Sequence, residues 1–162
     1  IDGQITIKIF CPPIDFGGKL FVDIEAMRVA DMLPVHTTID ESIQRIELWT
    51  KTDNHYAILL KETGNVIGYI VIKDFETDAH SKEIGFAIVS DYRKKGYISE
   101  AIRIIMCALK EQGVNYLWAC CYKENIASEN LLRKLGFEFQ KSNIHKPAHD
   151  HVYETLEFRI RL

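Results

Sequence analysis

The stretch Arg93-Lys94-Lys95-Gly96-Tyr97-Ile98-Ser99-Glu100 separates two apolar segments with different periodicity. Residues 84–89, which precede it, are apolar throughout, as in a strand that is covered on both faces. Residues 98–109, which follow, repeat apolar side chains at helical spacing. The chain is therefore predicted to leave a strand, turn, and enter a helix. Such an arrangement directs main-chain N–H groups and a helix N-terminus at one spot, which suits a phosphate group.

Basic residues and a glycine give this turn its chemistry. Arg93, Lys94 and Lys95 supply positive charge, and Gly96 lets a ligand come close to the main chain. A basic turn between a strand and a helix is also common on a solvated surface, so a short motif of this kind is weak evidence alone. The turn by itself leaves both interpretations open, a diphosphate-binding loop or a solvated face.

Size and composition place the chain among ordinary soluble proteins. Its 162 residues, 47% hydrophobic and 27% charged, are predicted to form a single domain over residues 1–162. The net charge of −3 gives no field that would favour nucleic acid. No apolar run approaches the roughly eighteen residues of a membrane span, and no signal peptide is visible. We therefore expect a cytoplasmic protein with neither a nucleic acid nor a membrane as partner.

The four cysteines and six histidines form no metal-binding pattern. Cys120 and Cys121 are adjacent on a predicted strand, so their side chains point to opposite faces, and no Cys-x-x-Cys pair occurs. His145, His149 and His151 lie in one predicted loop, but their spacing matches no zinc motif. We expect no metal, a reducing compartment, and cysteines that belong to the core instead of acting as nucleophiles.

Alternating and helical periodicities divide the whole chain into strands and helices. The predicted order is β-α-α-β-β-β-α-β-α-β-β, an α/β fold with a mixed, mostly antiparallel central sheet and helices on both faces. Residues 73–82 and 142–151 are predicted to be polar loops. The predicted strands cover residues 5–10, 56–60, 66–72, 84–89, 116–122, 137–141 and 152–162, and the predicted helices cover residues 15–23, 40–50, 98–109 and 125–135.

This order, together with three motifs, resembles the GCN5-related N-acetyltransferase (GNAT) superfamily over nearly the whole chain. Residues 93–98, RKKGYI, are similar to its pyrophosphate loop, R/Q-x-x-G-x-G/A. Residues 125–137, NIASENLLRKLGF, resemble its N-x-x-S-x-x-x-L-x-K-x-G-F helix and turn. Residues 23–28 and 36–41 resemble the opening of the ribosomal-protein N-acetyltransferase (Rim-type) branch. Ile98 departs from the pattern, because Gly or Ala is usual there, and it is expected to point inward with the apolar stripe.

The resemblance implies acetyl transfer from acetyl-CoA, as co-substrate, to a primary amine. The main-chain N–H groups and the helix dipole at residues 93–99 are expected to bind the diphosphate. In the family, the strand that carries Ile88 and Val89 splays from the strand that carries residues 119–121, and the pantetheine arm fits between them like an added strand. The expected cofactor-binding residues are Ile88, Val89, Arg93, Lys94, Lys95, Gly96, Ile98, Ser99, Asn125 and Ser128.

Two further roles complete the expected cofactor site. A main-chain N–H at Ile88 or Val89 is expected to polarise the thioester carbonyl and to hold the oxyanion that develops there. In the family, the side chain at Asn125 reaches the pantetheine region, and Asn125 can also cap its own helix. Both roles can coexist in one residue.

Glu83 is the candidate general base, acting on the amine directly or through a water. It stands at the head of the central strand, where burial would raise its pKa. An equally acceptable interpretation is a surface carboxylate paired with Lys82. Asp91, Glu76 and Asp78 are other candidate bases.

Ser128 is the candidate for the residue that protonates the leaving thiolate. Many family members use a tyrosine where this chain has Leu132, and Ser128 matches a serine that the ribosomal-protein branch is thought to use instead. A hydrogen bond to the backbone or to the cofactor's amide is the simpler role for this serine.

Three functions are compatible with these residues. The first is an enzyme that acetylates a protein N-terminus or a ribosomal protein. The second is an enzyme that acetylates a small amine, such as a polyamine, an amino sugar or an antibiotic, with the acidic residues 74–78 attracting the cation. The third is a non-catalytic acyl-CoA-binding module. The final strands could also pair across a homodimer.

Overall fold

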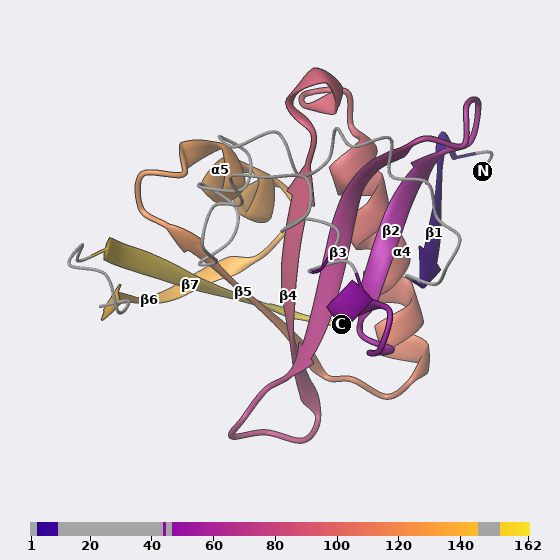
Figure 1. Ribbon diagram of the computed structural model, residues 1–162. Coiled ribbons are helices and arrows are strands. Elements are labelled where there is room, and N and C mark those ends of the chain that lie inside the picture. Colours follow the sequence, from indigo (N-terminus) through magenta and orange to yellow (C-terminus); the bar gives the residue numbers. More distant parts are fainter. Residues whose placement is uncertain (1–2, 10–43, 45–46, 146–152) are drawn as a thin grey trace. The chain divides into compact units, whose positions relative to one another are not determined.

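The computed structural model describes residues 3–9, 44, 47–145 and 153–162 (Figure 1). The predicted helix over 15–23 and the segments 23–28 and 36–41 lie outside the described residues. Of the predicted helix over 40–50, residues 44 and 47–49 are described and helical. The chain divides into two compact units, Ile1–Ile72 with Phe86–Ile104, and Lys73–Gly85 with Ile105–Leu162.

Seven described strands follow one another in the order β1-β2-β3-β4-β5-β7-β6. The β4–β5 pair is parallel, whereas β1–β2, β2–β3, β5–β7 and β6–β7 are antiparallel. This is the mixed, mostly antiparallel sheet of an α/β fold that the sequence predicts. The strands span Ile5–Ile9 (β1), His55–Leu60 (β2), Val66–Asp74 (β3), Ser81–Ile88 (β4), Tyr116–Tyr122 (β5), Glu138–His145 (β6) and Tyr153–Arg161 (β7).

The first unit holds β1, β2, most of β3, the end of β4 and the first half of α4. A tight turn joins β2 to β3, in which Gly64 has a φ of +72° and its N–H donates to the Leu60 carbonyl at 2.8 Å. The helix α4, Tyr97–Glu111, begins beside β1, because the Ile5 N–H donates to Glu100 Oε1 at 3.4 Å. The buried apolar side chains of this unit include Ile58, Ile67, Tyr69, Ile70, Ala101 and Ile102.

The second unit holds the start of β4, all of β5, β6 and β7, the second half of α4, and α5, Ile126–Lys134. Ser81–Ile84 of β4 pair with β5 in parallel, and β7 pairs with both β5 and β6. The helix α5 contacts β5 and β6. The buried apolar side chains include Ile84, Leu117, Ala119, Leu132, Phe137 and Phe158.

Two predicted loops are shorter in the structure than the sequence indicates. The loop predicted over 73–82 is wrong at both ends, because β3 continues to Asp74 and β4 begins at Ser81. The Phe75 N–H donates to the Ser81 carbonyl at 3.3 Å, and the Phe75 ring stacks on Trp118 with centroids 4.6 Å apart. The loop predicted over 142–151 is also wrong at its start, because β6 extends to His145 opposite Tyr153 of β7.

Gly68 of β3 lies where β4 comes unusually close. A Cβ atom built on Gly68 would lie 2.5 Å from the Ala87 carbonyl oxygen and 3.2 Å from the Ile88 Cα. Both neighbours belong to the main chain of β4, which cannot move aside as a flexible side chain can. The absence of a side chain at Gly68 therefore sets the position of the last residues of β4.

We expect Gly68→Ala to lower the free energy of unfolding by about 1–3 kcal/mol, because the added methyl group overlaps backbone atoms. Denaturant unfolding of the purified variant measures this change. Thr77→Ala, at an exposed residue of the β3–β4 turn, is the control and should stay within about 0.5 kcal/mol of the parent protein. Equal stability of the Gly68 variant and the parent would contradict the close approach.

Candidate functional site

Main-chain hydrogen bonds and two residues with positive φ shape the basic turn between β4 and α4. A short 3₁₀ turn, Ser90–Tyr92, follows β4, and the Arg93 N–H donates to the Ser90 carbonyl at 3.1 Å. Lys94 then takes a left-handed conformation with a φ of +59°, and Gly96 follows with a φ of +89°. Left-handed residues are uncommon outside glycine, and alternation of this kind makes successive N–H groups converge.

Within the described part of the chain, the N–H groups of residues 94–99 have no acceptor on the main chain. The first hydrogen bond of α4 runs from the Glu100 N–H to the Gly96 carbonyl at 3.0 Å. No main-chain carbonyl of the described residues accepts a hydrogen bond from the N–H groups of residues 94–99. These donors include the N–H groups that any α-helix leaves unpaired in its first turn. The Arg93 N–H, which the sequence predicts to be one of the diphosphate donors, is already paired with the Ser90 carbonyl, and diphosphate binding by the other N–H groups stays a prediction.

The side chains of the loop add positive charge. Arg93, Lys94 and Lys95 are all exposed, and Lys95 Nζ lies 5.4 Å from the centroid of the Tyr92 ring. Ile98 is half-buried. The loop thus combines exposed cations with main-chain N–H donors at a helix N-terminus, which is the chemistry that binds an anionic phosphate group.

The two residues predicted to supply an oxyanion donor differ in what their N–H groups do. The Val89 N–H donates to the Ile67 carbonyl at 2.9 Å, so it already has its partner. Main-chain groups of successive strand residues point in opposite directions, so the Ile88 N–H points away from β3. The parallel register of β4 with β5 runs from Ser81 to Ile84 and ends before Ile88. Ile88, and not Val89, is therefore the candidate for an oxyanion donor.

Asn125 and Ser128 form the N-terminal cap of α5. Asn125 is buried, and its Oδ1 accepts a hydrogen bond from the Ser128 N–H at 3.1 Å. The predicted capping role of Asn125 is thus confirmed. Leu132, where many family members have a tyrosine, is buried in the core of its unit. Ser128 is half-buried, so its hydroxyl stays a candidate for contact with a ligand.

Glu83 is a half-buried carboxyl whose pKa is raised. Burial is the largest cause, because it penalises the charged form, and the negative charges of Glu157 and Glu76 raise the pKa further. The Lys73 ammonium acts in the opposite direction. A carboxyl with a raised pKa holds a proton more strongly, as a general base for an amine must.

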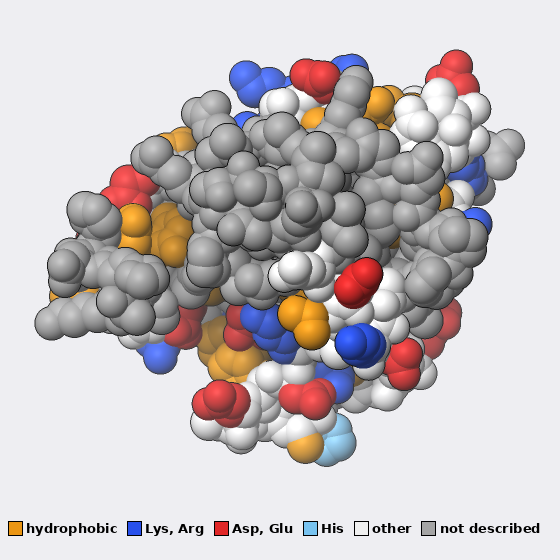
Figure 2. Space-filling model, in the orientation of Figure 1, with side chains coloured by type: hydrophobic (Ala, Val, Ile, Leu, Met, Phe, Trp, Pro, Cys, Tyr) orange, Lys and Arg blue, Asp and Glu red, His pale blue; other side chains and the backbone are white. Residues whose placement is uncertain are grey.

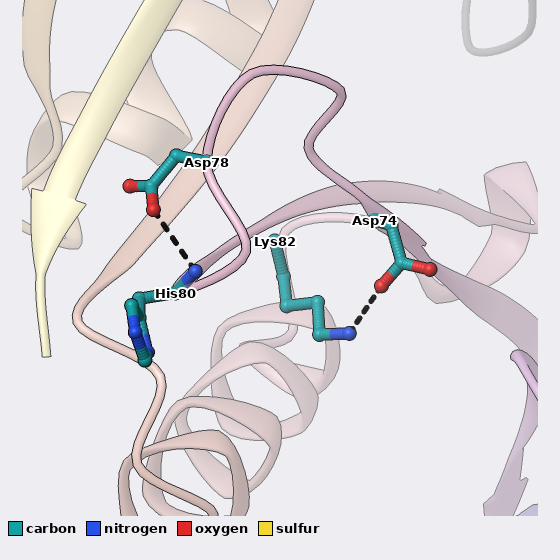
Figure 3. Close-up of polar contacts among 4 residues, drawn as sticks. All are labelled: Asp74, Asp78, His80 and Lys82. Atoms are coloured by element: carbon teal, nitrogen blue, oxygen red, sulfur yellow. Dashed lines mark hydrogen bonds and ion pairs between the residues drawn. The ribbon is translucent and has the colours of Figure 1, made fainter.

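Lys82 does not neutralise Glu83. Figure 3 shows Lys82 pointing to Asp74, with which it forms a hydrogen-bonded ion pair. The alternative interpretation of Glu83, as a surface carboxylate paired with Lys82, is therefore not supported. Neighbouring residues on a strand point to opposite faces, which explains why these two side chains part.

The acidic residues 74–78 lie around the turn between β3 and β4, where red side chains gather at the lower end of Figure 2. Asp78 accepts a hydrogen bond from the His80 N–H at 2.9 Å, as Figure 3 shows. It also accepts one from Ser81 Oγ at 2.6 Å. These two hydrogen bonds lower the pKa of Asp78. Asp78 is therefore a weaker base than its type suggests, which favours Glu83 among the candidates.

Cys120 and Cys121 are poor candidates for nucleophiles. Burial raises the pKa of the Cys121 thiol to about 12 and also raises that of Cys120. A thiol must lose its proton before it can attack, so both cysteines are unreactive at neutral pH. This agrees with their predicted place in the interior of β5.

The described residues contain neither a metal-binding cluster nor a membrane-spanning helix. Among the described residues, no group of three or more His, Cys, Asp or Glu side chains could hold a metal ion. His149 and His151 lie outside these residues, as does the side chain of His145. None of the described helices is long and apolar enough to cross a membrane.

Two residues that influence the candidate site, Glu157 and Gly68, belong to none of the motifs quoted from the sequence. Glu157, on β7, raises the pKa of Glu83, and Gly68, on β3, allows β4 to approach. A glycine inside a strand pattern is a general sign of close backbone approach, so Gly68 had a local signal. The position of Glu157 depends on the pairing of β5 with β7, which nothing local encodes.

The family of the chain follows from comparison with known proteins. The model of the acetyltransferase (GNAT) domain matches residues 14–138, and the chain belongs to this family. It is 30% identical over 111 residues to the uncharacterized N-acetyltransferase YnaD of Bacillus subtilis, a match that covers 67% of this chain and 65% of that protein. The match thus spans less than two thirds of that relative's own length.

Solved structures agree on the fold. A GNAT-family acetyltransferase from Bacillus anthracis superposes with a TM-score of 0.81 and 19% identity, covering 98% of this chain and 95% of that one. A ribosomal-protein-alanine N-acetyltransferase from Brucella melitensis gives a TM-score of 0.74 and 21% identity, covering 97% and 99% of the two chains. At these identities the likeness shows the fold alone. The predicted superfamily and fold class are confirmed.

Proposed function

We propose that this protein is an N-acetyltransferase that moves an acetyl group from acetyl-CoA to a primary amine, and that the acceptor is a protein N-terminus or a ribosomal protein. One observation carries the cofactor part of the proposal. The N–H groups of residues 94–99 have no acceptor among the described main-chain carbonyls, in a chain that belongs to the GNAT family. A diphosphate has the charge and the acceptor atoms that such donors lack.

The local geometry of the loop supports its proposed role in cofactor binding. The exposed Arg93, Lys94 and Lys95 side chains attract the anion, and the N–H groups from Lys94 to Ser99 bind it. The pantetheine arm pairs with the main-chain edge of β4 near Ile88, as an added strand does. By the family resemblance, Asn125 and Ser128 at the start of α5 are the other proposed pantetheine-binding residues.

The reaction needs three events at the reacting carbon. The amine gives a proton, through a water, to Glu83 and attacks the thioester carbonyl with its lone pair. The Ile88 N–H holds the oxyanion of the tetrahedral intermediate. The carbon–sulfur bond then breaks, and the thiolate leaves and takes a proton, for which Ser128 is the candidate donor.

A water between Glu83 and the amine fits the spacing of the residues. Glu83 and Ile88 are five residues apart on β4, which is roughly 16 Å of extended strand. A glutamate side chain and one amine span less than this distance. We therefore assign Glu83 a role through a bridging water, which is an established arrangement for a general base.

Protein N-termini fit a carboxylate base better than most small amines do. An α-amino group has a pKa of about 7.7–8.0, whereas a lysine-like amine has one of about 10.4. The α-amine therefore gives up its proton more readily at neutral pH. Ser128 and the absence of a tyrosine at Leu132 also favour the ribosomal-protein branch, which has a solved member in Brucella melitensis.

Gly96→Val tests the loop. A left-handed backbone costs a residue with a side chain roughly 1–2 kcal/mol, so we expect the Kd of acetyl-CoA to rise about tenfold or more. Isothermal titration calorimetry measures this change. Gly113→Val is the matched control, because Gly113 has a φ of +81° at the opposite end of α4 and should leave the Kd unchanged. Normal affinity in the Gly96 variant would refute the loop assignment.

Glu83→Gln tests the base. We expect kcat to fall by on the order of 10²-fold, because general base catalysis is lost, while the Kd of acetyl-CoA changes little. Steady-state release of free thiol gives the rate, and calorimetry gives the affinity. Asp78→Asn is the control and should keep most of the activity. Unchanged turnover by the Glu83 variant would remove this residue from the mechanism.

A panel of amines tests the acceptor class. We expect thiol release with peptides that have a free N-terminus, and little release with the same peptides N-acetylated, with polyamines or with amino sugars. Mass spectrometry then places the acetyl group on the α-nitrogen. Preferred turnover of a small amine would move the protein to the second class of acceptor, and acetyl-CoA binding with no turnover by any amine would make it a non-catalytic module.

A further inference from the structure

Glu83 and Glu157 share one face of the sheet in the second unit. Glu83 stands opposite Trp118 in the parallel β4–β5 register. Across the antiparallel β5–β7 pair, Trp118 stands opposite Arg159, and Cys120 stands opposite Glu157. Directly opposed residues lie on the same face, as do residues two apart on one strand. Glu157 therefore lies two strands from Glu83, on the face that Glu83 occupies.

The Glu157 carboxylate is held in place from β6. Asn143 Nδ2 donates a hydrogen bond to Glu157 Oε1, and Lys141 Nζ lies 3.6 Å from Glu157 Oε2. The side chain is mostly enclosed, with 24% of its surface exposed. Lys141 stands directly opposite Glu157 in the β6–β7 register. Glu157 is thus a fixed negative charge, unlike a solvated glutamate that moves through many rotamers.

We propose that Glu157 is a positioning residue for acetyl transfer, which acts through Glu83 by placing a fixed negative charge on the same face of the sheet. The inference rests on the proposed function of Glu83 as the base. In the transfer step, the proton of the attacking amine passes through water to the Glu83 carboxylate. A nearby negative charge favours this protonated product, so it makes the proton transfer more favourable.

The other charged groups around Glu83 leave this role to Glu157. Lys73, on β3, stabilises the charged form of Glu83. Glu76, in the β3–β4 turn, disfavours that charged form, but less strongly than Glu157 does. Arg159 of β7 lies over the rings of Trp118 and Tyr116, at 5.2 Å and 4.5 Å. Cys120 of β5, between the two carboxyls on this face, keeps its proton, because burial raises its pKa and the charges of Glu83 and Glu157 add to the effect.

The experiment compares three variants on β7 by two readouts. Glu157→Gln removes the charge and keeps an oxygen for Asn143, whereas Glu157→Asp keeps the charge. Glu154→Gln is the matched control, because Glu154 lies on the opposite face of the same strand, paired with Lys123 at 2.7 Å. NMR titration of the ¹³C-labelled glutamate carboxyls, assigned with Glu83→Gln, follows the protonation of Glu83 directly. Thiol release over pH gives kcat/KM.

We expect Glu157→Gln to move both the Glu83 titration and the acidic limb of kcat/KM to lower pH. At neutral pH its kcat/KM should fall about two- to tenfold, because the base is weaker. Glu157→Asp and Glu154→Gln should keep both curves close to those of the parent protein. A purely structural role of Glu157 would lower the rate without moving either curve.

Two outcomes would overturn the inference, and they differ in what else they affect. A Glu83 titration that does not move in Glu157→Gln shows that the two groups do not interact, and it leaves the role of Glu83 as base untouched. A titration that moves while the pH profile of kcat/KM stays fixed shows that Glu83 does not limit turnover, which also contradicts its proposed role as the base.

Discussion

The main-chain N–H groups at the start of α4 are the constraint on which the rest of this site depends. A helix cannot pair its first N–H groups internally, and unpaired donors are costly unless water or a ligand satisfies them. Here the preceding turn adds donors, because Lys94 and Gly96 both have positive φ. Residues 93–96 of this turn are exposed, so an anion from solution can reach its donors.

The strand β4 links this loop to the candidate base. Contacts with β3 fix the end of β4. Gly68 lets the main chain of β4 approach β3, and the Val89 N–H donates to the Ile67 carbonyl. Because directions alternate along a strand, that same hydrogen bond makes Ile88 present its N–H on the other side. Alternation also separates Lys82 from Glu83 at the start of the strand, which leaves Lys82 to Asp74 and Glu83 without that neutralising partner. One strand thus carries both the proposed base and the proposed oxyanion donor.

The features that the sequence predicts well are local ones. The helical stripe of α4, the bounds of β5 and the Asn125 cap of α5 all depend on residues within a few positions of one another, and each is confirmed. The errors arise where distant segments meet. The β3–β4 turn is shortened by the stacking of Phe75 on Trp118, and β6 is lengthened by its pairing with β7. Glu157 was missed for the same reason, because its relation to Glu83 exists only once β5 joins their strands.

A carboxyl in the position of Glu83 is a stability cost that its proposed role as a base would explain. Burial raises the pKa of Glu83 in the folded state. Such a carboxyl contributes to folding stability at pH values below its pKa in the unfolded chain. This contribution is lost as the pH rises through its pKa in the folded protein. At neutral pH the fold therefore contains a charge that it would be more stable without. Glu157 increases this cost, since it adds a second negative charge on the same face, itself offset by Lys141 and Asn143. A sheet selected for stability alone would place neutral residues here, so the pair points to chemistry that needs a strong base.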